Sequence, residues 1–145
     1  MNLELAIAVL LIFCAASYLV LGARLVASKR AVGSVPIGVL LMVISVWVMG
    51  GAIELLSSTF TIFTLGRTGH FVGTALVPVV AYACFREYTG VETSTRSLAL
   101  LLIIPILSIL LAATNVHHEA MWFLPNTNEA GEFLTRPDKW GPWFL

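Results

Sequence analysis

The stretch LAIAVLLIFCAASYLVLGA, residues 5–23, contains no charged side chain. A helix rises about 1.5 Å per residue and the hydrocarbon layer of a bilayer is about 30 Å thick, so a run of this length is able to cross it. Three more charge-free runs follow, at residues 31–53, 68–85 and 97–116. The sequence therefore predicts an all-α, polytopic membrane helix bundle with four transmembrane helices and an irregular outer C-terminal tail. We expect the helices at about residues 3–26, 35–57, 62–86 and 97–115, in one membrane domain covering residues 1–145.

The composition supports a membrane protein and excludes several other classes. Apolar residues make up 59% of the 145 residues, charged residues 11%, and the mean hydropathy is +0.94, outside the range of soluble domains. Eight basic and eight acidic residues cancel, so nucleic acid is not an expected partner. Cys14 and Cys84 lack the spacing of a disulfide framework. The neighbouring His117 and His118 point about 100° apart on a helix, so we expect no metal and no cofactor.

The distribution of cations predicts the orientation in the membrane. Five of the eight cations lie in the loop between the first two helices (Arg24, Lys29 and Arg30) or between the last two (Arg86 and Arg96). The other side carries three cations among more acidic residues, along longer segments. Because Lys and Arg in short loops favour the cytoplasmic side, we expect a multi-pass cell-membrane protein whose N-terminus and C-terminal tail are extracytoplasmic.

Polar residues gather near the outer ends of the expected helices. Glu54 lies there on the second helix, Arg67 and His70 on the third, and Asn115 and His118 where the fourth emerges. A carboxylate facing a cation would offset the cost of placing either in lipid, about 2.5 to 3.5 kcal/mol at the bilayer centre and less near the interface. Two interpretations stay open. The five residues form an outward-facing ligand or signal pocket, or they are snorkelling groups and a structural ion pair.

Other residues have an expected structural role. Trp47 is spaced to share a face of the second helix with Glu54, and Gly69 and Gly73 form a GxxxG pattern that permits close approach of backbones. We expect these glycines to pack inside the bundle, although a dimer face, and so a homodimer, stays open. Pro78 and Pro105 lie within the third and fourth helices and predict bends, either static or hinge-like.

Short motifs also occur in a characteristic order, and Tyr88-Thr89-Gly90 among them predicts the end of the third helix. The others are Gly73-Thr74-Ala75-Leu76-Val77-Pro78, Ile104-Pro105, Thr114-Asn115 followed by His117-His118 and Trp122, and Gly141-Pro142-Trp143-Phe144. In this order they resemble the N-terminal seven-helix sensor region of membrane histidine kinases, and the stretch from Trp47 to Glu54 fits its second helix. Three tryptophans, Trp122, Trp140 and Trp143, suit the outer interface, where an indole ring is buried and its N–H is hydrated.

The resemblance implies a membrane-embedded signal-input module of a two-component receptor. Because the sequence ends where the fifth helix of such a region would begin, we expect it to correspond to the first four of seven helices. It has no room for a phosphoacceptor helix or an ATP-binding domain, and we expect no catalytic activity of its own. Expected partners are the lipid bilayer, a downstream signalling domain or further helices, and an unidentified small ligand.

Two other classes of function compete with a sensor. The first is a small four-helix transporter or channel subunit in which Glu54 couples or lines a pore. A proton-coupled carrier would hold its carboxylate near the bilayer midplane, whereas Glu54 lies toward the outer end of its helix. The second is a structural subunit or assembly factor, with which the sequence is also compatible.

Overall fold

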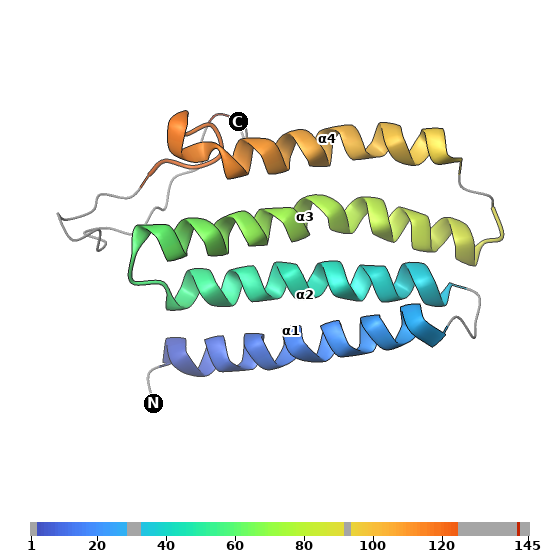
Figure 1. Ribbon diagram of the computed structural model, residues 1–145, viewed down its shortest axis with the longest axis horizontal. Coiled ribbons are helices and arrows are strands. Elements are labelled where there is room, and N and C mark those ends of the chain that lie inside the picture. The colour runs from blue at the N-terminus through green and yellow to red at the C-terminus, as the bar shows by residue number, and fades with distance from the viewer. Residues whose placement is uncertain (1–2, 29–32, 92–93, 125–141, 143–145) are drawn as a thin grey trace.

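The computed structural model describes residues 3–28, 33–91, 94–124 and 142. Its elements are helices α1 (Leu3–Ser28), α2 (Ser34–Leu56), α3 (Phe60–Tyr88) and α4 (Thr95–Ala113), followed by the short 3-10 helix η1 (Asn115–His117). The four long helices lie side by side in chain order, each antiparallel to the next (Figure 1). All four are long and apolar enough to cross a membrane, so the predicted all-α bundle with four such helices is confirmed.

The ends of the helices follow from local chemistry. Ser94 caps α4, because its hydroxyl oxygen accepts a hydrogen bond from the backbone N–H of Arg96 at 3.3 Å. Gly90, at φ 70°, closes α3, and the N–H of Val91 bonds back to the carbonyl of Arg86 at 3.0 Å. α3 extends two residues beyond the expected range at each end, from Phe60 to Tyr88. The expected residues Trp140 and Trp143 of the tail lie outside the described residues.

Helices α1 and α2 approach each other at a pair of glycines. A Cβ atom built on Gly22 would lie 2.6 Å from the carbonyl oxygen of Gly38, and one on Gly38 would lie 2.7 Å from that of Gly22. The hydroxyl of Ser45 donates to the carbonyl of Ala15 at 2.7 Å across the same interface. Small residues and a buried interhelical hydrogen bond are the usual means of packing helices in a membrane.

Helices α2 and α3 are packed even more closely. A Cβ on Gly50 would collide with the backbone nitrogen of His70 and would lie 2.7 Å from the carbonyl oxygen of Gly66. A Cβ on Gly73 would collide with Trp47 and would lie 2.5 Å from its Cα. The GxxxG pattern therefore serves the α2–α3 interface within the chain.

Helices α3 and α4 pack differently. An open pocket of about 420 Å³ lies between parts of them, lined by Pro78, Val79 and Tyr82 of α3 and by Leu101, Ile104 and Pro105 of α4. Both prolines lie inside their helices. Because a proline has no backbone N–H and its ring occupies the space of the preceding turn, it interrupts the regular packing surface of a helix. This interface is consequently less complete than the α2–α3 interface.

Candidate functional site

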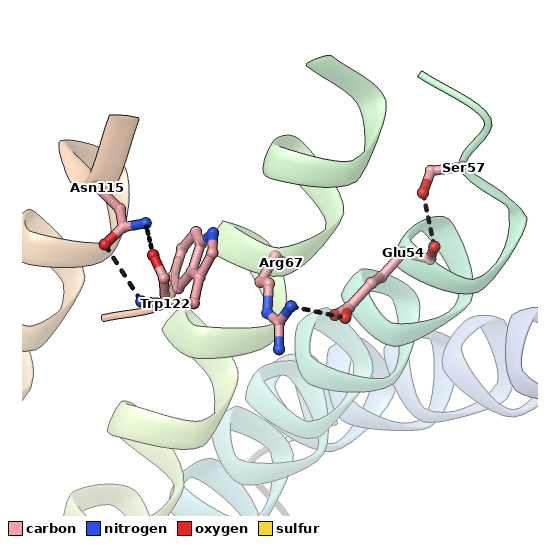
Figure 2. A network of polar contacts seen from close by, with 5 residues as sticks. All are labelled: Glu54, Ser57, Arg67, Asn115 and Trp122. Carbon is pink, nitrogen blue, oxygen red and sulfur yellow. Dashed lines mark hydrogen bonds and ion pairs between the residues drawn. The ribbon is translucent and has the colours of Figure 1, made fainter. Parts of the chain in front are cut away.

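Arg67 occupies the centre of the polar cluster at one end of the bundle. Its Nη1 lies 3.6 Å from Oε1 of Glu54, which is on the last turns of α2, and this ion pair joins α2 to α3 (Figure 2). The Arg67 side chain is only 10% exposed, against 27% for Glu54. Ser57 fixes the end of α2 beside this pair, because its hydroxyl donates to the backbone carbonyl of Glu54 at 2.7 Å. The pair is therefore largely shielded from solvent.

Aromatic rings flank the guanidinium of Arg67. Its Cζ lies 5.2 Å from the ring centroid of Phe63 and 5.4 Å from that of Trp122. Both distances are within the range of a cation–π attraction, which is stronger where water is excluded. Trp122 in turn stacks on Phe71, with centroids 5.2 Å apart and an interplanar angle of 11°. Arg67 thus connects α2 and α3 with the segment that follows α4.

Asn115 holds that segment in place (Figure 2). Its side chain is fully buried, its Nδ2 donates to the carbonyl of Trp122 at 2.7 Å, and its Oδ1 accepts from the backbone N–H of Met121 at 2.8 Å. The N–H of Trp122 approaches the same oxygen at 3.4 Å. One amide side chain therefore satisfies three backbone groups of the buried residues Met121 and Trp122, and it directs the chain back over α3.

The prediction that the N–H of Trp122 is hydrated is wrong. Trp122 is 0% exposed, and its Nε1 is buried with no hydrogen-bond partner among the described residues. The physical reason is the turn at Asn115, which returns Trp122 to the bundle, where it packs with Phe71, Ala112 and Met121. Hydropathy alone does not reveal this turn, because the deciding interaction is one between a side chain and the backbone of residues six and seven positions later.

His70 lies on the same helix as Arg67 but makes different contacts. Its Nε2 accepts a hydrogen bond from Nε1 of Trp47 at 3.0 Å, and the two rings meet edge to face with centroids 5.9 Å apart. Since Nε2 is an acceptor, the proton of the neutral ring is on Nδ1. Nδ1 is buried, and a Cβ on Gly51 would lie 3.4 Å from it. His70 and Trp47 are thus part of the close α2–α3 interface.

His118 lies in the exposed turn after η1. Its Nδ1 accepts from the backbone N–H of Ala120 at 3.0 Å, and its Nε2 is 3.0 Å from the hydroxyl of Thr114. These local contacts shape the turn that Asn115 closes. The structure therefore brings together Glu54, Arg67 and, through Trp122, Asn115. His70 instead contacts Trp47, and His118 contacts Thr114 and Ala120.

We call Glu54, Phe63, Arg67, Phe71, Asn115 and Trp122 the Arg67 cluster. Its two phenylalanines and Trp122 were not among the five predicted site residues. Phe63, Arg67 and Phe71 follow each other at intervals of four, so their shared helical face was a signal available in the sequence. Among residues 3–28, 33–91, 94–124 and 142, no three His, Cys, Asp or Glu side chains gather in a way that would hold a metal ion.

Four apolar, membrane-length helices in sequential antiparallel order define the protein as a multi-pass helical membrane protein. Residues 5–145 match the family described as the N-terminal 7TM region of histidine kinase, and the chain belongs to this family. The predicted resemblance is confirmed, and it covers nearly the whole chain. Comparisons with curated proteins and with solved structures give no match. The chain is therefore a membrane helical region of the type found at the N-termini of histidine kinases.

Proposed function

We propose that the chain is a signal-input module of a histidine kinase receptor, and that the Arg67 cluster is the part that responds to the signal. The observation that carries this proposal is the position of Arg67. One largely buried cation contacts Glu54 of α2, Phe63 of its own helix and Trp122 beyond α4. A change at this side chain therefore acts on three segments at once.

The chemistry of the cluster indicates the class of ligand. A small molecule with a carboxylate or another anionic group would compete with Glu54 for the guanidinium of Arg67, and a flat apolar part would compete with Trp122 for the face of Phe71. Either competition separates segments that are in contact in this structure. A ligand shifts such an equilibrium only by its difference in affinity for the two arrangements.

Helix α4 is the element that would transmit the change. Displacement of Trp122 strains its hydrogen bonds with Asn115, which directly follows α4. Because the cavity beside Pro78 and Pro105 leaves α4 incompletely packed on α3, α4 is free to shift at low cost. We propose that this shift is the output passed to the downstream signalling domain.

The orientation belongs to the same proposal. The start of α1, the end of α2, the start of α3 and the end of α4 lie at one end of the bundle (Figure 1), and Glu54 and Arg67 belong to these segments. In the sequence, five of the eight cations lie near the opposite helix ends or between them. The positive-inside tendency therefore supports an extracytoplasmic Arg67 cluster. Single cysteines at the exposed Ser28 and Ser58, in a chain with Cys14 and Cys84 replaced by alanine, test it. An impermeant thiol reagent on intact cells is expected to label position 58 and not position 28.

The sensory role is tested in a complete receptor that carries this region and a kinase domain. Glu54→Ala and Arg67→Ala are expected to change the basal autophosphorylation rate in membranes at matched expression, since each removes one side of the ion pair. Arg24→Ala, an exposed cation on α1, is the matched control. Autophosphorylation equal to wild type in both cluster variants would reject the proposal and leave the cluster with a structural role only.

A transporter or channel is less well supported. Glu54 is two residues from the end of α2 and is paired with Arg67. Neither this position nor this pairing suits a coupling carboxylate, which would lie near the midplane. The cavity between α3 and α4 is lined by apolar side chains apart from Tyr82, and such a lining does not replace the hydration shell of an ion.

A further inference from the structure

The hydrogen bond between Trp47 and His70 depends on the protonation state of the imidazole. The indole Nε1 of Trp47 is a donor only, and it donates to Nε2 of His70 at 3.0 Å. Because Nε2 is the acceptor, the neutral ring carries its proton on Nδ1, which is buried and has no hydrogen-bond partner among the described residues. The bond between α2 and α3 therefore exists only while Nε2 of His70 has a free lone pair.

Protonation of His70 would remove this lone pair. Histidine is the side chain whose ordinary titration range, about pH 5 to 8, includes physiological pH. When a proton from the solvent adds to Nε2, both ring nitrogens become donors, and no other covalent bond forms or breaks. Two N–H groups then face each other where the structure has a hydrogen bond of 3.0 Å. The neutral ring therefore stabilises the contact with Trp47, and acidification weakens it.

The charged groups near His70 act on its ring in opposite directions. Glu54 of α2 attracts a charged imidazole, whereas Arg67, one turn earlier on α3, repels it. Helix α4, the other helix packed on α3, carries one charged residue, Arg96, at the opposite end of the bundle from the start of α3 (Figure 1). The segment after α4 carries three further groups: the exposed His117 and His118 and the half-exposed Glu119. The change in the role of Nε2 from acceptor to donor is therefore the direct effect of protonation on Trp47.

The packing around His70 determines which part is able to move. A Cβ on Gly50 would collide with the backbone nitrogen of His70, and a Cβ on Gly51 would lie 3.4 Å from its Nδ1, so the imidazole is held against the backbone of α2. Trp47 is 38% exposed, so its indole has room to turn outward. We propose that His70 is a proton-sensitive switch that releases the Trp47 indole on acidification, while the glycine contacts keep α2 and α3 together. The switch does not depend on a signalling role of the Arg67 cluster.

NMR of the full chain in detergent micelles, with isotope-labelled tryptophan and histidine, tests this switch. Trp47→Phe identifies the Trp47 indole signal by its loss. As the pH falls from about 8 to about 4.5, this N–H signal is expected to move upfield in one step, toward an indole without an acceptor. The nitrogen shifts of His70 should show a proton on Nδ1 alone above the step and on both nitrogens below it. His70→Gln, which keeps an acceptor that does not titrate, should abolish the step.

Two further variants separate His70 from the other groups that titrate. His117→Gln removes an exposed histidine and is the matched control, so the Trp47 step should be the same as in wild type. Glu54→Gln removes the nearby carboxylate, and the step should remain. A step that persists in His70→Gln, or one that is lost in Glu54→Gln, would overturn the proposal. A wild-type ring protonated on Nε2 at neutral pH would also overturn it, and this result does not depend on the folding of any variant.

Discussion

The two faces of α3 are packed in opposite ways. Toward α2 the contact is backbone to backbone, because Gly50 and Gly73 leave no room for a side chain. Toward α4 an open pocket lies between the helices beside Pro78 and Pro105. In lipid, where association depends on close van der Waals contact and interhelical hydrogen bonds, the first interface is rigid and the second is adjustable. Helix α3 thus has one closely packed neighbour, α2, and one loosely packed neighbour, α4.

The polar interactions reinforce this difference. On the α2 side, the Glu54–Arg67 ion pair and the Trp47–His70 hydrogen bond add to the glycine contacts. On the α4 side, the described polar connection is indirect and passes through the turn that Asn115 holds after the helix has ended. Helix α4 is therefore held at this end by Trp122, whereas its middle borders the cavity.

The largest expected effect comes from breaking the glycine interface. Gly73→Ala should destabilise the bundle by about 3 kcal/mol, the upper end of the usual cost of overpacking, because the new Cβ meets the backbone of Trp47. The free energy of unfolding in mixed micelles measures it. Gly69→Ala is the matched control, since its Cβ would lie 3.7 Å from Cα of Gly50, an ordinary contact. Equal stability of the two variants would contradict the description of this interface as rigid.

Removing the turn after α4 ranks second. Asn115→Ala should cost about 2 kcal/mol, because it leaves buried backbone groups of Met121 and Trp122 without partners. Thermal unfolding in detergent gives the stability, and tryptophan fluorescence should show a more polar environment for Trp122. His118→Ala, in the exposed part of the same turn, should have a much smaller effect. Equal stability of the two variants would show that the Asn115 amide does not hold this turn.

The ion pair between α2 and α3 is expected to contribute less. In a double-mutant cycle, Glu54→Gln and Arg67→Met should show a coupling of about 1 kcal/mol. Once one residue is replaced, the ion pair is already lost, so replacing the other residue costs less than it does in the wild type. The exposure of Glu54 and the 3.6 Å separation argue against a larger value. Strict additivity of the two substitutions would show that the residues act as independent groups at the membrane surface.

The smallest effect is expected at the α3–α4 cavity. Ile104→Ala should cost less than about 1 kcal/mol, because this side chain is 68% exposed and borders space that is already empty. A fully buried Ile→Ala substitution costs about 2 to 5 kcal/mol. Denaturation of the variant alongside wild type measures the difference. A loss of unfolding free energy as large as that of a fully buried Ile→Ala substitution would mean that α4 is packed against α3 as closely as α2 is.

The sequence was sufficient for the parts of the fold that depend on hydropathy and local backbone chemistry. Charge-free runs predicted the four spanning helices, and the motif order predicted the family. The adjacency of Glu54 and Arg67 was also available as an expectation, because both were placed near the same ends of neighbouring helices. A membrane restricts the depth of charged groups so strongly that sequence position becomes a guide to spatial position.

The sequence did not indicate how the segment after α4 folds back. The N–H of Trp122 was expected to be hydrated, whereas the whole side chain is buried beside Phe71 and Arg67. Its position depends on Asn115, whose amide pairs with backbone groups several residues away, and no periodic pattern records such a contact. Nor does hydropathy distinguish the close α2–α3 interface from the open α3–α4 interface, since all four helices are strongly apolar.

We propose that α4 moves relative to α3 while α2 does not, and that Trp122 controls this movement. Spin labels on the exposed positions Tyr88 and Leu100 report the distance between α3 and α4. Labels on Tyr88 and Ile37 report the distance between α3 and α2. Electron paramagnetic resonance in nanodiscs compares wild type with Trp122→Ala. The substitution is expected to shift or broaden the 88–100 distance distribution and to leave the 37–88 distribution unchanged. Unchanged distributions for both pairs, or equal changes in both, would contradict the account.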